Sequence, residues 1–256
     1  MATIVTLLLY LMISSNLSNN TTQEVTVISD DMTDSKKPYN PNDSFIVNYR
    51  QPVNGYKVRA VVHYSHIYDW NNASISFTKN GKSFILTTTS FGDSLFNKGG
   101  WGMDGTNEEI MKKYQKKTVE VNYHENREDG ETFPIYTPFF FRDLDFDGIE
   151  ELVIVHLSSG VRYSDEYDVY RIVDGKPILI DYPPYRTNDD FGMTDYPEFD
   201  YKKKTITCPY PEGELRRTGC KIYGISKKKK DIVVVNGKKH FFNHMEVIKE
   251  IKYEDE

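Results

Sequence analysis

Oxygen donors alternate along one short acidic stretch of this chain, directly after an aromatic run. Asp143, Asp145 and Asp147 occupy every second position, and Gly148 follows where such a stretch must turn sharply. Ca²⁺ accepts hard oxygen ligands at roughly 2.3–2.6 Å from a tightly curled backbone, and glycine bends without a Cβ clash. The pattern therefore predicts a calcium loop over residues 143–151. Its five expected ligands are Asp143, Asp145, Asp147, the backbone carbonyl of Ile149, and Glu151.

This loop departs from an EF-hand at its end. The twelfth position is Ile154 rather than a bidentate glutamate, and a β-branched run follows where an EF-hand has a helix. We therefore expect a structural calcium loop between two β-strands, and the alternative is a solvated acidic turn. Because five protein oxygens leave little room for a substrate around the ion, we do not expect an enzyme.

Other patterns that could do chemistry are weaker. The sequence contains no Gly-x-Ser-x-Gly elbow, no phosphate-binding loop and no His-Glu-x-x-His motif. His240 and His244 are four residues apart, but they fall on predicted strand rather than on a helix, so they lack the geometry of a zinc pair. In an exported protein, Cys208 and Cys220 would form one disulfide, worth about 3 kcal/mol for closing the intervening loop. In a cytosolic protein they would be two thiols.

Short aromatic and β-branched runs separated by turn signals occupy most of the chain. Asn80-Gly81, Asp174-Gly175 and Asn236-Gly237 favour two-residue hairpin turns, because these residues tolerate a positive φ. Residues 107–117 are expected to form one short helix with Asn107 as its cap. We predict a mostly β, single-domain protein, an antiparallel β-sandwich or barrel-like fold that carries the EF-hand-like calcium loop.

The first 44 residues differ in composition from the rest. An apolar run from Ile4 to Ile13 is too short to span a bilayer and has a polar exit, as in a secretory signal peptide. The polar residues after it cannot bury enough surface to offset their own ordering entropy. We predict a signal peptide at 1–20, a disordered tether at 21–44 and a β-domain at 45–256 in a periplasmic or secreted protein. The alternative for the apolar run is a buried strand.

The overall charge and hydropathy exclude some classes of partner. A net charge of −6 argues against nucleic acid, and a mean hydropathy of −0.59 argues against an integral membrane protein. Lysines nevertheless cluster at residues 202–204, 227–230 and 238–239. Such lysines deter aggregation of exposed strands, or they contact an anionic surface such as a membrane headgroup layer or a cell-wall polymer.

The order of these segments resembles that of one protein group. An apolar leader and a polar tether precede a β-domain that contains Phe-x-Asp-Leu-Asp-Phe-Asp-Gly-x-x-Glu-Leu at residues 141–152 and Tyr-Asp-Val-Tyr-Arg-Ile at residues 167–172. In this the chain is similar to the periplasmic calcium-loop proteins related to the I-type lysozyme inhibitors. Some of those proteins act as immunity proteins against secreted peptidoglycan hydrolases. The likeness covers residues 50–250 in layout and residues 139–170 in recognisable sequence.

A Ser-Gly-x-x-Tyr motif follows the acidic stretch. In lysozyme inhibitors of this kind, such a loop enters the glycosidase cleft and hydrogen-bonds the catalytic carboxylates. The resemblance implies that Ser159, Gly160 and Tyr163 make this contact, and Arg162 could add electrostatic attraction. The implied function is inhibition of, or immunity to, a lysozyme-like peptidoglycan hydrolase. The alternative is a calcium-stabilised surface or adhesion module without inhibitory activity.

Overall fold

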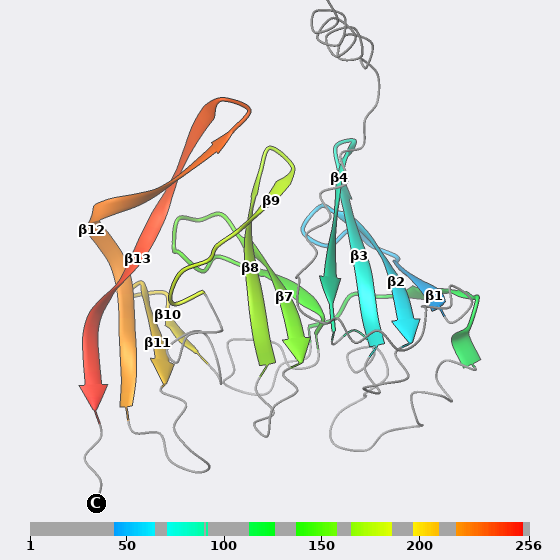
Figure 1. Ribbon diagram of the computed structural model, residues 1–256, viewed down its shortest axis with the longest axis horizontal. Helices are drawn as coiled ribbons and strands as arrows, with labels where there is room; N and C mark the ends of the chain where they lie inside the picture. Colours follow the sequence, from blue (N-terminus) through cyan, green and yellow to red (C-terminus); the bar gives the residue numbers. More distant parts are fainter. Residues whose placement is uncertain are drawn as a thin grey trace, which may run out of the picture.

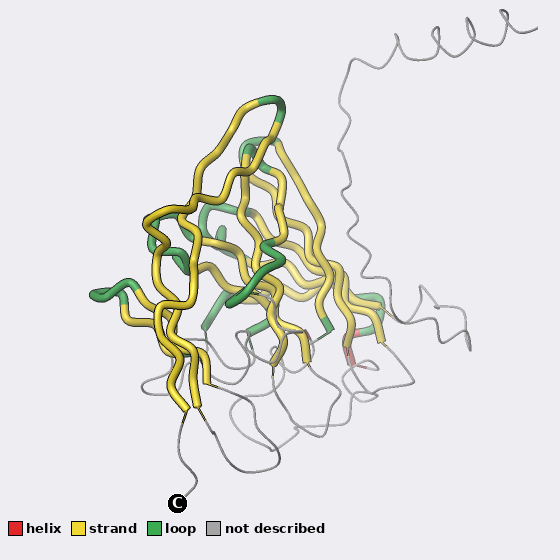
Figure 2. The backbone as a smooth tube through the Cα atoms, turned by 60° about the vertical axis from the view of Figure 1, so that its left-hand side comes forward, coloured by secondary structure: helices red, strands yellow, loops and turns green. Residues whose placement is uncertain are grey.

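The computed structural model describes residues 44–64, 71–89, 91, 113–125, 137–157, 165–185, 197–209 and 219–252. Thirteen β-strands make up most of this part of the chain, which confirms the predicted mostly β class (Figure 2). None of its helical residues forms a helix long and apolar enough to cross a membrane. The predicted signal peptide and tether, up to residue 43, lie outside the described residues.

The described strands form three sheets. The first sheet has the order β4 (Lys82–Thr88), β3 (Asn71–Lys79), β2 (Lys57–Tyr64), β1 (Ser44–Tyr49), β5 (Thr118–Val121). The central sheet has the order β6 (Phe139–Arg142), β7 (Glu151–Leu157), β8 (Asp165–Val173), β9 (Lys176–Leu179). The third sheet has the order β10 (Glu198–Asp200), β11 (Thr205–Pro209), β12 (Gly219–Val235), β13 (Lys238–Lys252). Neighbouring strands are antiparallel except for β1 and β5, which are parallel.

The three predicted hairpin turns are present. Asn80-Gly81 joins β3 to β4, Asp174-Gly175 joins β8 to β9, and Asn236-Gly237 joins β12 to β13. All six residues have positive φ, for example 53° at Asn80 and 74° at Gly81. This conformation matches the turn to the right-handed twist of the strands, so the dipeptides fix the register of each hairpin.

The central sheet is buried on both faces. Phe139 and Phe141 pack into a hydrophobic cluster shared with the first sheet, whereas Phe140 packs into a second cluster shared with the third sheet. β7 repeats this division, with Leu152 on the first side and Val153 on the second. Successive side chains of a strand point to opposite faces, so a strand buried on both sides needs an unbroken apolar run.

The sheets therefore pack as three layers. Figure 1 shows the green central sheet between the blue-to-cyan first sheet and the yellow-to-red third sheet. The predicted sandwich arrangement is borne out in this extended form, while the barrel-like alternative is not, because the described sheets do not close on themselves.

The predicted helix falls only partly within the described chain. Residues 107–112 lie outside the described residues, and Lys113 and Tyr114 are helical. Lys116 then takes a φ of 59° and donates its N–H to the carbonyl of Ser44 at 2.8 Å. A left-handed residue of this kind ends a helix and turns the chain, here into β5 beside β1.

The predicted disulfide is wrong. Cys208 and Cys220 are both buried, and no disulfide joins them. The β11–β12 register pairs Cys208 with Lys221 and Pro209 with Cys220, so the two cysteines are offset by one position. Adjacent positions of a strand point to opposite faces, which explains why cysteines near the facing ends of two paired strands are not bridged. Burial raises the pKa of the Cys208 thiol well above 9.0, which keeps it protonated.

Candidate metal centre

The acidic loop between β6 and β7 brings three carboxylates together. Asp143, Asp145 and Glu151 each offer one oxygen, and these oxygens lie within 4.8 Å of one another. Asp145 is fully buried and Glu151 is 1 % exposed. Three of the five predicted calcium ligands thus converge, which a solvated acidic turn would not require.

Backbone N–H groups curl this loop around its own side chains. Asp143 accepts hydrogen bonds from the N–H groups of Asp147 at 3.1 Å and Gly148 at 3.0 Å. Asp145 accepts a second bond from the Asp147 N–H at 3.1 Å. Gly148 has a φ of 89°, a conformation that side chains rarely adopt, so the predicted need for glycine at the sharp turn is met.

The far end of the loop is closed by Glu151. Its Oε2 accepts the N–H of Leu144 at 2.8 Å, so the first residue of β7 is tied to the start of the loop. The carbonyl of Leu144 in turn accepts a hydrogen bond from the buried hydroxyl of Tyr185 at 3.0 Å. Both backbone polar groups of Leu144, the second residue of the loop, are therefore hydrogen-bonded.

The two remaining predicted ligands are Asp147 and the backbone carbonyl of Ile149. Asp147 is not among the three convergent carboxylates, and its Oδ1 accepts the N–H of Ile149 at 2.7 Å. The Ile149 side chain is 60 % exposed. Asp147 and the Ile149 carbonyl therefore stay predictions as ligands.

The convergent carboxylates are poorly compensated without a cation. Burial, opposed by Arg171 and reinforced by the charge of Asp147, raises the pKa of Asp145 from 3.8 to about 6. Burial and the neighbouring Asp145 charge raise the pKa of Glu151 well above 4.5. Three carboxylates and the single guanidinium of Arg171 carry a formal charge of −2 when ionised, which one divalent ion would neutralise. The donor set, all hard oxygens, suits Ca²⁺.

Arg171 on β8 is the residue that the sequence analysis missed. It is 4 % exposed, and its Nη2 lies 2.9 Å from Asp145 Oδ2. Its Nε lies 3.9 Å from Glu151 Oε1, which is an ionic contact but too long for a hydrogen bond. A signal for it was available: Tyr167 and Val169 on the same face of β8 point into the core, so the strand period places Arg171 inward too.

The same guanidinium connects the loop to the third sheet. Arg171 Nη1 lies 2.8 Å from Asp231 Oδ2 on β12, and Nη2 donates to the carbonyl of Asn243 on β13 at 3.0 Å. The guanidinium also lies 4.5 Å from the centre of the Phe242 ring, a cation–π contact. Asn243 completes the connection by donating from Nδ2 to the carbonyl of Asp145 at 2.9 Å.

Asp231 is the second anionic partner of this network. The Tyr182 hydroxyl donates to its Oδ2, and His244 Nδ1 lies 2.7 Å from its Oδ1. Although burial opposes ionisation, hydrogen bonds from Tyr182, Arg171 and His244 hold the pKa of Asp231 below 3.8. His244 thus pairs with Asp231, whereas His240 Nε2 lies 3.9 Å from Asp174 Oδ2, so the two histidines have different carboxylate partners.

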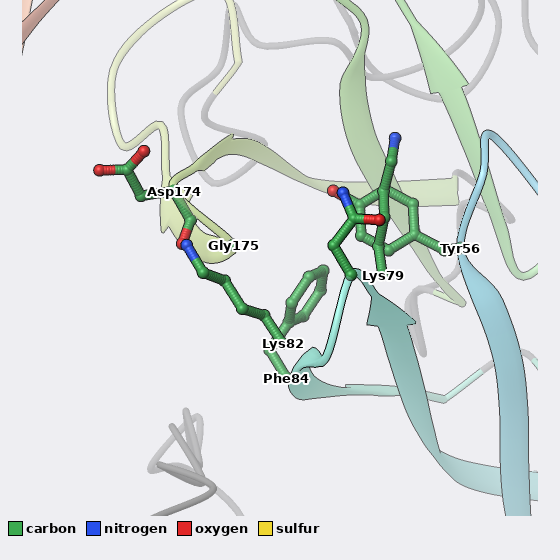
Figure 3. A pocket seen from close by; sticks show the side chains of 7 residues that line it. Tyr56, Lys79, Lys82, Phe84, Asp174 and Gly175 are labelled. Atoms are coloured by element: carbon green, nitrogen blue, oxygen red, sulfur yellow. The ribbon is translucent and has the colours of Figure 1, made fainter.

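A separate cleft of about 230 Å³ lies between the β3–β4 and β8–β9 hairpins (Figure 3). Lys82 extends across it and donates from Nζ to the carbonyl of Asp174 at 2.7 Å. Lys79 Nζ lies 4.7 Å from the centre of the Tyr56 ring and donates to the carbonyl of Asn54 at 3.1 Å. Lys82 therefore joins β4 of the first sheet to the β8–β9 turn of the central sheet, whereas Lys79 contacts the β1–β2 connection of its own sheet.

The predicted partner loop cannot be compared with the structure. Ser159, Gly160, Arg162 and Tyr163 lie outside the described residues. The strands on either side are described: β7 ends at Leu157, which pairs with Asp165 at the start of β8. Leu157 lies at the end of β7 opposite the acidic loop, about 20 Å from Glu151 at the usual rise of a strand.

Comparisons with known proteins do not identify a family. No protein-family model and no curated protein matches the sequence. Among solved structures, the chain is similar to one described as "Structure of a Xanthomonas Type IV Secretion System related protein". The two are 13 % identical, the match covers 77 % of this chain and 92 % of that one, and the TM-score is 0.32. A likeness this distant carries no conclusion about this chain.

Proposed function

We propose that this chain is an exported calcium-binding protein that acts by binding another protein and not by catalysis. The observation that supports the proposal is the convergence of Asp143, Asp145 and Glu151 within 4.8 Å. Two of these carboxylates are buried, and within the described part of the chain Arg171 supplies the one guanidinium that pairs with them. Such a charge imbalance in a buried loop is relieved by a divalent cation.

The three convergent carboxylates would hold the ion, with Asp147 and the Ile149 carbonyl completing the set. A bound Ca²⁺ supplies positive charge that stabilises the ionised carboxylates and fixes the β6–β7 connection. The chain itself orients the carboxylates. Backbone N–H groups orient Asp143 and Asp145, and the Leu144 N–H orients Glu151.

The partner we propose is a lysozyme-like peptidoglycan hydrolase, inhibited by insertion of the Ser159-to-Tyr163 loop into its active site. A serine hydroxyl and a tyrosine phenol are neutral donors, so they can meet two catalytic carboxylates without a competing charge. The strands that precede and follow this motif, β7 and β8, are paired with each other, and fixed loop ends reduce the entropy lost on docking. The rival proposal, a calcium-stabilised surface or adhesion module, makes no use of the motif.

Calcium binding is tested first, by calorimetric titration of Ca²⁺ into chelator-treated full-length protein. We expect one ion per chain and a higher melting temperature, because a ligand selective for the native state stabilises it. Glu151→Gln should abolish the binding heat, while the neighbouring exposed Glu150→Gln should leave it unchanged. Equal behaviour of these two adjacent variants would remove the basis of the calcium proposal.

Inhibition is tested separately, by adding purified protein to cell walls digested by a panel of lysozymes, including hydrolases encoded near its gene. We expect lysis by at least one of them to be blocked, and Ser159→Ala with Tyr163→Phe to abolish the block. Ser158→Ala is the matched control and should retain it. Intact calcium binding without inhibition of any hydrolase would favour the surface module.

A further inference from the structure

The distal half of the β12–β13 hairpin is a narrow arm, residues 226–244. Figure 1 shows it, orange to red, twisting away from the rest of its sheet and extending past it. A bulge marks its base: Ile225 pairs with Met245 and Lys230 pairs with Asn243, so residues 226–229 stand opposite the single residue His244. Such a bulge bends a hairpin and increases its twist.

One face of the arm packs against the central sheet. Val233, Val235 and Phe242 form a small hydrophobic cluster with Val173 and Ile178. Asp231 lies opposite Phe242 and turns inward to Arg171, as described above. The inner face of the arm is thus covered by contacts within the protein.

The outer face of the arm is apolar and exposed. Ile232 lies directly opposite Phe241, and Val234 lies two positions further along β12, so the three side chains share one face. They are 54 %, 63 % and 60 % exposed, respectively. Three large apolar side chains that share one exposed face of a hairpin form a candidate interaction site.

Lysines surround this apolar face. Lys239 stands opposite Val234 on the same face, and Lys230 lies two positions before Ile232. Three further lysines, 227–229, are exposed at the bulge, where the Ser226 hydroxyl accepts the N–H groups of Lys228 at 3.2 Å and Lys229 at 3.0 Å. The arm carries six lysines and one acidic residue, the inward-facing Asp231, although the whole chain has a net charge of −6.

We propose that the arm docks onto an anionic phospholipid bilayer. Ile232, Val234 and Phe241 enter the boundary between headgroups and acyl chains, and the lysines meet the lipid phosphates. An apolar centre with a basic rim is the arrangement that interfacial membrane anchors use, since burial of apolar area and attraction to anionic lipid add together.

A bilayer fits this surface better than a protein partner does. Three side chains that are each about 60 % exposed present on the order of 300 Å² of apolar surface, whereas a stable protein interface buries about 800 Å² on each side. A bilayer can take up the outer face of the hairpin alone, and its phosphates can pair with lysines on both edges. A second copy of the chain would bring one lysine-rich arm against another, which like-charge repulsion opposes.

The proposal is tested with full-length protein and sedimented vesicles, either phosphatidylcholine alone or phosphatidylcholine and phosphatidylglycerol in equal parts. We expect binding to the anionic vesicles that falls as salt is raised, and little binding to the neutral ones. The triple variant Ile232→Ser, Val234→Ser, Phe241→Ser should bind the anionic vesicles at least about a hundredfold more weakly. Because wild type and variants share the same apolar N-terminal run, differences between them report on the arm.

Matched controls separate the arm from overall charge and hydrophobicity. Lys227→Gln, Lys228→Gln, Lys229→Gln should weaken binding roughly a hundredfold, at about fivefold per lysine. Replacing the three lysines at residues 202–204 by glutamine removes the same charge from the β10–β11 turn and should have little effect. Leu179→Ser with Val247→Ser removes exposed apolar groups, 44 % and 45 % exposed, outside the arm and should also leave binding unchanged.

Three outcomes would overturn the proposal. The first is vesicle binding that the arm variants leave intact, and the second is equal loss with the two lysine sets. The third is a protein that ignores vesicles but dimerises or binds an acidic protein through Ile232, Val234 and Phe241, which would make the face a protein interface. Circular dichroism spectra matching wild type show that a variant without binding is folded, since these side chains lie outside the core.

Discussion

Replacement of Arg171 by methionine tests whether the buried charge network has the role assigned to it. The guanidinium lies 2.9 Å from Asp145 and 2.8 Å from Asp231, and it donates to the Asn243 carbonyl at 3.0 Å. Methionine keeps much of the apolar stem but removes every one of these contacts. In calcium-free protein, the buried carboxylate of Asp145 would then lose the one cationic side chain that pairs with it within the described residues.

The expected loss of stability follows from the burial of the pair. Removing one partner of a buried ion pair costs about 3–5 kcal/mol, because the other charge is left uncompensated. For a domain of this size, each kcal/mol lowers the melting temperature by about 2–4 °C, so the calcium-free variant should melt roughly 6–20 °C below wild type. Arg59→Met on the exposed side of β2 is the matched control and should change stability by no more than about 0.5 kcal/mol.

Calcium affinity should move in the opposite direction. A guanidinium beside Asp145 and Glu151 repels an incoming cation, and at about 6 Å even a water-like dielectric makes a +1 and a +2 charge repel by about 1.4 kcal/mol. Arg171→Met should therefore bind Ca²⁺ at least about tenfold more tightly, measured by calorimetry below the melting range. If the variant lost stability and affinity together, Arg171 would be a structural support and not an electrostatic competitor of the metal. If its stability were unchanged, the network would not hold the loop to the arm.

Three further results are expected. Burial raises the pKa of Asp145 from 3.8 to about 6, so its contribution to the stability of the calcium-free protein is present below pH 4 and is lost as pH rises through 6. Saturating calcium favours the ionised form and should reverse this pH dependence. Denaturation of wild type and Asp145→Asn across this pH range measures both effects. Reducing agent should leave the melting temperature unchanged, because no disulfide joins Cys208 and Cys220. Alkylation of these two cysteines, followed by mass spectrometry, should be slow until the protein unfolds, because both thiols are buried. Phe140→Ala should cost about 3–5 kcal/mol in chemical denaturation, since Phe140 is fully buried between two sheets, whereas Phe241→Ala should cost little because that ring is 63 % exposed.

Local chemistry explains why the hairpins could be predicted. Asn80-Gly81 and Asn236-Gly237 adopt positive φ almost independently of what surrounds them, so the sequence determines the turn and the turn determines the pairing. The acidic loop is local in the same sense. Its glycine and its alternating carboxylates act within nine residues, and the N–H groups that orient Asp143 come from the loop itself.

Strand register is where the prediction from sequence failed. Cys208 and Cys220 lie on neighbouring strands, as expected, but a shift of one position separates a bridged pair from an unbridged one. β12 continues through the lysine run at residues 227–230 by means of a bulge, which the sequence analysis did not predict. No turn dipeptide specifies such a bulge, because the bulge depends on the contacts that fix the position of the partner strand.

The contacts of Arg171 explain why its partners could not be predicted, although the strand period of β8 places its side chain inward. Its partners Asp145 and Asp231 lie 26 and 60 residues away, on a loop and on a strand of a different sheet. Only the packing of the third sheet on the central sheet brings them together, and that packing depends on apolar side chains such as Phe140 and Met245. The formation of the Arg171 charge network therefore depends on the packing of the apolar core. A buried ion pair gains little net free energy over a pair of apolar residues, although removing one partner alone is costly, so the role of the pair is better sought in what it positions. Arg171 positions two things at once, the acidic loop and the inner face of the arm.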